Sequence, residues 1–124
     1  MVEKRRYPRY PSKIKTKFSY YSGNPDEIDY DISVPLKGKG VICDISRGGV
    51  LIITGERVSV GVPALMNFKV GKTKRAVHGH IVRTGLLANN PTEVARRMAG
   101  FTTHGDAYVA VEFKEPIEIS RDDL

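Results

Sequence analysis

KGVICDISRGGVLIIT, residues 39–54, consists of two short apolar runs joined by the polar sequence SRG. Both runs are rich in Val and Ile, which favour β-strands, and so short a connection suits antiparallel neighbours. The stretch therefore predicts a β-hairpin with strands over residues 39–45 and 49–54. Inside it, CDISRGGVLI (residues 43–52) places Asp44, Ser46 and Gly49 directly before a strand that is apolar enough to be buried. These three residues either close the turn between the strands or form part of a ligand-binding site.

Four further segments outward from this hairpin have strand character. Residues 13–21 alternate between apolar and polar side chains, which is typical of a half-buried strand. The other expected strands are ALMNFKV (64–70), RAVHGHIVRTG (75–85) and AYVAVEF (107–113). Six short strands separated by turn-rich segments predict an all-β fold, either a small antiparallel barrel or a sandwich.

One helix is expected near residues 91–99. Asn90 can cap it, Pro91 suits its first turn, Val94 and Met98 share one face, and Gly100 ends it.

The composition is that of a single folded domain. A chain of 124 residues can bury a core without disulfides or metal. No apolar stretch approaches the roughly 20 residues of a membrane helix, and the charged N-terminus has no apolar run that would make it a secretory signal. With Cys43 as the single cysteine, no internal disulfide can form. We expect a cytoplasmic protein without membrane insertion.

The formal net charge of +6 is concentrated in two segments. Residues 1–17 carry seven basic residues against Glu3 alone, and residues 68–83 carry five against no acid. This distribution predicts an anionic partner.

Several catalytic or metal-binding patterns are incomplete. VGKTKR contains the GKT of a phosphate-binding loop, but Met66 stands where that motif needs glycine. His78 and His80 share a strand face without a third ligand nearby, and Cys43 lies in an apolar run, which predicts a small buried hydrophobe. Ser46, Asp44 and a histidine could form a triad, but no strand-turn-helix elbow holds the serine. We therefore expect no enzyme, no metal and no cofactor.

The N-terminal sequence KRRYPRYP favours a binding arm. Arg5 and Arg9 stand four residues apart, and Pro8 and Pro11 stiffen the segment without allowing a helix. Guanidinium groups on such an arm can pair with phosphate or with the N7 and O6 edge of guanine. A solvated tail is the alternative interpretation.

The residues of DISRGG would complement that arm. An ionised Asp44 can accept the N1 and N2 protons of guanine, Ser46 lies on the same strand face, and Gly49 permits a close approach of the backbone. A side-chain turn that closes the hairpin explains the same residues without any ligand.

Taken together, the two segments resemble the PilZ domain family, bacterial receptors for cyclic di-GMP. The signatures of the family, Arg-x-x-x-Arg and Asp/Asn-x-Ser-x-x-Gly, stand here intact as residues 5–9 and 44–49. The resemblance continues through VLII, GHIVR and AYVAVEF. A second DIS at residues 31–33 is followed by Leu36 where the signature needs glycine.

The resemblance implies a six-stranded antiparallel β-barrel over residues 13–124, preceded by a flexible basic arm over residues 1–12. It also implies a binding site for cyclic di-GMP and signalling to an unidentified downstream protein. The principal ligand contacts would be Arg5, Arg9, Asp44, Ser46 and Gly49, with Arg6, Arg47 and Gly48 as auxiliary contacts.

The sequence departs from the family pattern in two places. Pro116 and a short acidic tail leave room for little more than one turn of the closing helix that is usual in the family, and residues 85–106 look like an insertion.

Two alternatives stay open. The first is a PilZ-like protein-interaction module that binds no nucleotide, although such members generally lack the arginines. The second is a small barrel that binds nucleic acid through the same basic surface, a partner that we do not expect.

Overall fold

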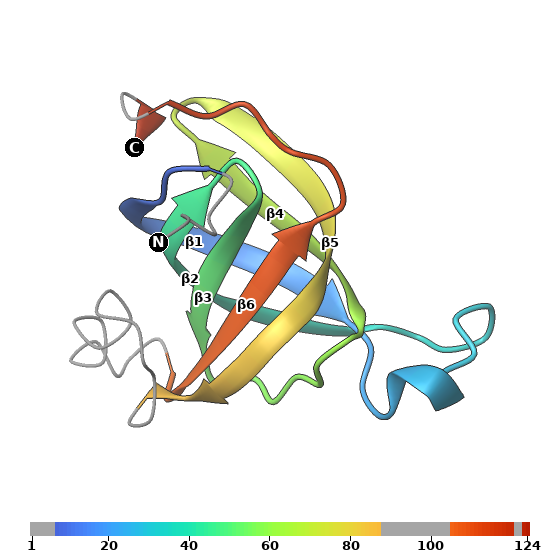
Figure 1. Cartoon of the computed structure of the whole chain (residues 1–124). Coiled ribbons are helices and arrows are strands. Elements are labelled where there is room, and N and C mark those ends of the chain that lie inside the picture. The colour runs from blue at the N-terminus through green and yellow to red at the C-terminus, as the bar shows by residue number, and fades with distance from the viewer. Residues whose placement is uncertain (1–6, 88–104, 121–122) are drawn as a thin grey trace, which may run out of the picture.

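The computed structural model describes residues 7–87, 105–120 and 123–124. Six antiparallel strands close into one barrel in the order β1-β2-β3-β6-β5-β4 (Figure 1). The strands are β1 (Tyr10–Tyr20), β2 (Leu36–Ser46), β3 (Gly49–Thr54), β4 (Pro63–Val70), β5 (Thr73–Leu86) and β6 (Ala107–Phe113). The predicted all-β, six-stranded antiparallel barrel is therefore confirmed, and its hairpin of residues 39–54 forms β2 and β3.

Strands β1 and β2 each begin three residues earlier than the sequence pattern predicts. Strand β1 begins at Tyr10 rather than at residue 13, and β2 begins at Leu36 rather than at residue 39. Pro11 pairs with Asp44 of β2 at a register shift in the ladder. Such irregular positions tolerate a proline, which cannot donate a ladder hydrogen bond.

The long connection between β1 and β2 extends away from the barrel (Figure 1). It contains a short 3₁₀ helix, η1 (Pro25–Glu27), which the sequence analysis did not predict. The side chain of Asn24 caps it by accepting the backbone N–H of Asp26 at 3.0 Å. The helix expected near residues 91–99 lies outside the described residues.

The barrel interior is filled by alternate residues of all six strands. Strand pleating sends every second side chain inward, so the period-two pattern of β1 buries Thr16, Phe18 and Tyr20. The largest fully buried side chains of the interior are Ile42, Ile45, Ile52, Met66 and Ile81.

A second apolar cluster lies outside that core. It consists of Cys43, Leu51, Ile53, Leu87 and Tyr108, all buried. Cys43 is thus the small buried hydrophobe that its apolar surroundings predict.

After β6 the chain turns back across one end of the barrel. Residues 114–120 form no helix, and Ile117 is buried against the core. This irregular segment covers the barrel end near the β2–β3 turn, to which it is hydrogen-bonded. Within the described ranges, no helix is long and apolar enough to cross a membrane.

Candidate ligand-binding site

The β2–β3 turn is held by the side chain of Ser46. Its hydroxyl accepts the backbone N–H of Gly48 at 3.1 Å and donates to the carbonyl oxygen of Gly49 at 3.4 Å. Neither Arg47 nor Gly48 adopts a positive φ, so the turn is not one of the mirror-image types usual for two-residue hairpins. These two hydrogen bonds support the turn-closing interpretation of Ser46.

The same turn is fixed to the segment after β6. The backbone N–H of Phe113 donates to the carbonyl oxygen of Gly48 at 2.9 Å, and that of Ile117 donates to Arg47 at 2.8 Å. The guanidinium of Arg47 donates to Glu118 at 2.9 Å and to the carbonyl oxygen of Ile117 at 3.3 Å. Arg47 is thus engaged with the C-terminal segment, and its role as an auxiliary ligand contact stays a prediction.

The two glycines of the turn have close neighbours. A Cβ atom on Gly49 would collide with the carbonyl oxygen of Val111 on β6. A Cβ atom on Gly48 would lie 3.0 Å from the ring of Tyr7. Packing within the protein therefore requires glycine at position 49, whereas at position 48 a side chain would have to displace the ring of Tyr7.

Tyr7 packs on the turn from the N-terminal side. Its ring lies against Gly48, and the guanidinium carbon of Arg47 is 5.2 Å from the ring centroid, within the range of a cation–π interaction. The sequence indicated that the tyrosines beside the arginines could add stacking surface, but it did not predict that Tyr7 packs on the β2–β3 turn.

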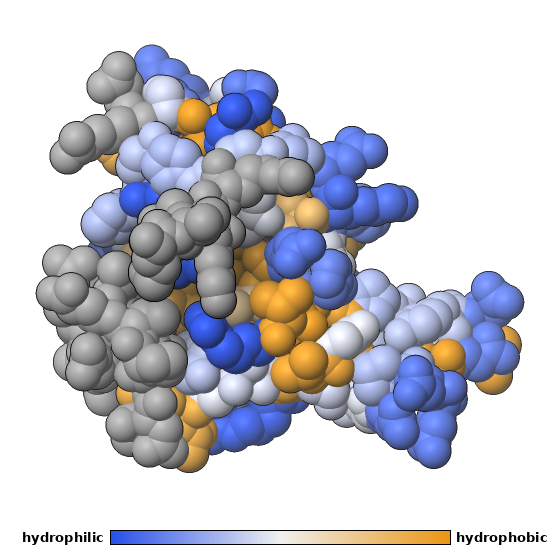
Figure 2. All heavy atoms as spheres, viewed as in Figure 1, coloured by the Kyte–Doolittle hydropathy of each residue, from blue (hydrophilic) through white to orange (hydrophobic). Residues whose placement is uncertain are grey.

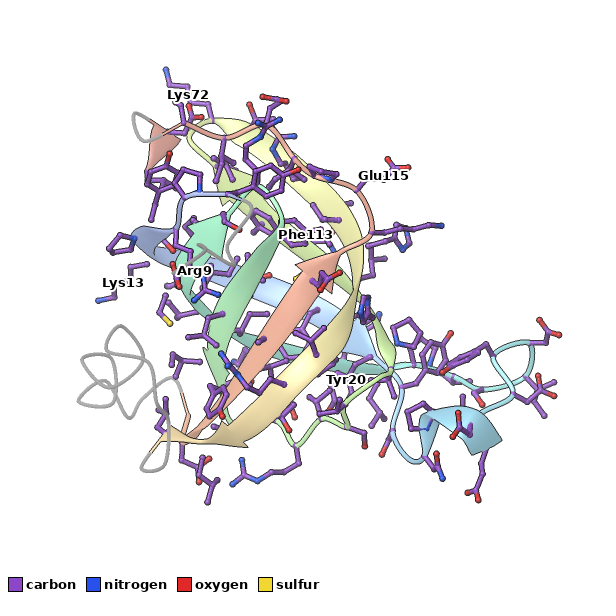
Figure 3. The ribbon with its side chains drawn as sticks, viewed as in Figure 1. Arg9, Lys13, Tyr20, Lys72, Phe113 and Glu115 are labelled. Atoms are coloured by element: carbon purple, nitrogen blue, oxygen red, sulfur yellow. The ribbon has the colours of Figure 1, made fainter. Side chains whose placement is uncertain are left out.

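Asp44 and Arg9 meet beside the hairpin. Asp44 is buried, with 6% of its surface exposed, and its carboxylate oxygen Oδ2 lies 3.8 Å from Nη1 of Arg9. Arg9 keeps 42% of its side chain exposed. Figure 3 shows Arg9 beside β2 and β3. One residue from each signature is therefore present in one ion pair, although 35 positions separate them in the sequence.

These residues line an open pocket of about 640 Å³. The side nearest the turn is formed by Tyr7, Arg9, Asp44, Ser46, Gly48 and Gly49. The opposite side comes from β5, β6 and the residues that follow, including Arg83, Glu112 and Lys114. Five of the predicted ligand contacts therefore line one pocket, namely Arg9, Asp44, Ser46, Gly48 and Gly49. Two others, Arg5 and Arg6, lie outside the described residues.

Arg83 is the most notable residue that the sequence analysis missed. The ladders align Asp44 with Leu51, Leu51 with Ala110, and Ala110 with Arg83, so that Asp44 and Arg83 lie in one cross-strand row. The guanidinium carbon of Arg83 is 5.9 Å from the ring centroid of Tyr108. The sequence showed only that Arg83 lies in a basic segment. Its alignment with Asp44 depends on how β2, β3, β6 and β5 pair, which the sequence pattern does not reveal.

The triad that Ser46 could form with a histidine of β5 is not assembled. The ladders run from Ser46 through Gly49 and Glu112 to His80. Three strand spacings separate serine from histidine, about 14 Å, which is far beyond hydrogen-bond reach.

Comparisons with known proteins agree with this fold. The family model described as "PilZ domain" matches residues 3–124. A solved structure, "Structure of Bacillus subtilis Inhibitor of motility (MotI/DgrA)", is similar with a TM-score of 0.58 and 14% sequence identity over 98% of this chain and 46% of that chain. At this identity the likeness establishes the fold alone, and this chain spans less than half of the matched one. The comparison with curated proteins finds no match. The match to the family model over nearly the whole sequence shows that the chain belongs to the PilZ domain family.

Proposed function

We propose that this chain is a cyclic di-GMP receptor in which the ligand orders the N-terminal arginine segment over the barrel and so signals to a downstream protein. PilZ domains are non-catalytic receptor modules that typically bind cyclic di-GMP. The proposal adds which residues of this chain bind the ligand and how binding changes the surface.

The observation that carries the proposal is the approach of Arg9 to Asp44 at the rim of the pocket. At 3.8 Å the pair is too long for a strong hydrogen bond, and Arg9 is partly exposed. The guanidinium can therefore move to a phosphate or to a guanine edge at a small cost. Asp44 can then accept the N1 and N2 protons of a guanine, which keeps its buried charge compensated.

The remaining contacts follow from the pocket lining. Ser46, Gly48 and Gly49 line the pocket together with Asp44, and the two glycines contribute no side chains of their own there. We assign Arg5 to the second guanine or phosphate, with Arg6 and Arg47 as auxiliary cations. Arg83 and Lys114, on the opposite side of the pocket, add positive charge for a dianionic ligand.

Signalling in this proposal needs no catalysis. The segment before β1 moves when Arg5 and Arg9 take hold of the ligand, and this movement changes the surface around Tyr7 and the β2–β3 turn. A downstream protein that binds this surface more tightly in one form, with or without bound ligand, then responds to the ligand.

The test is a calorimetric titration with cyclic di-GMP at about 150 mM salt, where non-specific charge attraction is weakened. GTP and linear GpG serve as controls. Saturable binding that is selective for the cyclic form supports the proposal. Absence of binding would contradict it and favour the interaction module that binds no nucleotide.

A further inference from the structure

Lysine side chains cover one outer face of the barrel, away from the pocket. The face is formed by β1, the first half of β2, β4 and the start of β5, and its lysines are all exposed. They are Lys13, Lys15, Lys17, Lys37, Lys39, Lys69 and Lys74, and we call this surface the lysine face. In Figure 3, Lys13 points away from the barrel.

The strand register brings these charges close together. Lys17 of β1 is directly opposite Lys39 of β2, and Lys69 of β4 is directly opposite Lys74 of β5. Directly opposite residues have Cβ atoms about 5 Å apart, and like charges in such pairs are destabilising. The face therefore carries a cost in folding stability.

Among the described residues, no carboxylate forms an ion pair with Lys17, Lys39, Lys69 or Lys74. The three ion pairs between described residues are formed by arginines, namely Arg9 with Asp44, Arg47 with Glu118 and Arg57 with Asp106. The outward-facing positions of the lysine face that carry no lysine are occupied by proline, serine, asparagine, alanine and other uncharged or imidazole side chains, without Asp or Glu. An external anionic partner would relieve the repulsion.

We propose that the lysine face binds the surface of an anionic phospholipid bilayer, as a peripheral contact without insertion. The face contains no outward-facing arginine, phenylalanine, tyrosine or tryptophan. Single-stranded nucleic acids are bound through aromatic side chains on which the bases stack, and protein interfaces are depleted in lysine. Lipid headgroups diffuse laterally, so they can match any spacing of point charges, and each lysine near such a surface strengthens binding about five-fold.

The barrel order makes this contact compatible with an open pocket. Strand β1 is three positions from β6 around the closed barrel, and Figure 1 shows β1 passing behind β3 and β6. A bilayer that meets β1 and β4 therefore leaves the β6 side of the pocket facing solvent. The inference stands independently of cyclic di-GMP binding.

The experiment is cosedimentation of the full chain with phosphatidylcholine vesicles, with and without phosphatidylglycerol, at low and at physiological salt. The test variant is Lys17→Thr/Lys39→Thr, which removes one cross-strand pair and keeps residues that favour strands. The matched control is Ile32→Asp/Val34→Asp, which lowers the net charge by the same two units at exposed positions of the β1–β2 connection.

We expect the parent to bind vesicles that contain phosphatidylglycerol and to lose binding as salt increases. The lysine variant should bind about 25-fold more weakly, and the control should change far less. Circular dichroism checks that both variants are folded. Equal weakening by the two variants, or no preference of the parent for anionic vesicles, would overturn the proposal. Binding of the parent to a duplex oligonucleotide as tightly as to anionic vesicles at the same salt would also overturn it, in favour of nucleic acid.

Discussion

Gly49 occupies a place where two strands come too close for any side chain. A Cβ atom there would meet the carbonyl oxygen of Val111 and lie 3.6 Å from the Cα atom of Glu112. The sequence indicated that this glycine shapes the turn and the approach of a ligand. The structure adds a packing requirement that comes from β6.

Gly49→Ala should therefore destabilise the fold by about 1 to 3 kcal/mol, because β6 must move away from the turn. Chemical denaturation followed by circular dichroism measures the change. Gly55→Ala is the control, since the nearest atom to a Cβ there is 4.0 Å away. Equal denaturation midpoints for the two variants would show that the close approach to Val111 has no energetic consequence.

Individual site residues could be predicted only where they stand close together in the sequence. Asp44, Ser46 and Gly49 lie within six consecutive residues of one hairpin, so their types and spacing can be recognised from the sequence alone. Tyr7 and Arg83 reach the same pocket through contacts with distant segments, and nothing in their immediate sequence specifies those contacts.

At the scale of elements, the N-terminal segment and β1 are continuous. Arg9 directly precedes the first residue of β1, and Tyr7 already packs on the β2–β3 turn. The predicted division into an arm of residues 1–12 and a barrel of residues 13–124 therefore differs from the strand boundary. Period-two alternation identifies the centre of β1, but the pairing of Tyr10 and Pro11 with β2 depends on a bulge that the pattern does not indicate.

If the ligand orders the segment before β1, trypsin should cleave after Arg5, Arg6 and Arg9 more slowly when cyclic di-GMP is bound. Cleavage after Lys72, in the β4–β5 turn away from the pocket, provides the internal control. Mass spectrometry of the early fragments measures both rates. Unchanged cleavage at the arginines under saturating ligand would contradict the ordering mechanism while leaving binding itself untouched.

An ion pair links the β3–β4 connection to the residues just before β6. It is formed by Arg57 and Asp106. The guanidinium donates two hydrogen bonds to the carboxylate, at 3.0 and 2.9 Å. These hydrogen bonds, more than the attraction of the charges, lower the pKa of Asp106 below its ordinary value. A carboxyl group with a lowered pKa in the folded state adds stability above its unfolded pKa and loses it as pH falls through the folded pKa.

Arg57→Ala should therefore raise the pKa of Asp106 toward its ordinary value. The stability difference between parent and variant should be present at neutral pH and vanish as pH falls through the pKa of Asp106 in the parent. Both side chains are exposed, so the effect should be small and weakened by salt. Carboxyl NMR titration measures the shift, and an unchanged pKa would exclude the hydrogen bonds as its cause.

At the scale of the whole molecule, closure of the barrel builds the site. The six strands and their antiparallel character were predictable because alternation and turn residues are local signals. Their circular order is not local, and it is this order that places β5 and β6 opposite the turn and forms the pocket. The hydropathy view in Figure 2 shows the mixture of polar and apolar surface on the side of the molecule that carries β3 and β6.

The same closure separates two surfaces with different charge. The pocket combines Arg9 and Arg83 with Asp44 and Glu112, whereas the lysine face carries positive charge alone. The sequence analysis counted both basic segments as one indication of an anionic partner. Each segment contributes to both surfaces, because Arg9 and Arg83 line the pocket while lysines of the same two segments lie on the lysine face. This division follows only from the strand order.

The central claim is that Arg9 and Asp44, one from each signature, hold the same ligand. The most direct measurement is a double-mutant cycle of cyclic di-GMP affinity, by calorimetry, on the parent, Arg9→Ala, Asp44→Asn and the combined variant. We predict that each single change weakens binding about ten- to a hundred-fold. The combined change should cost less than the product of the two, because the residues act on one ligand and on each other. Single variants that bind as tightly as the parent would contradict the claim.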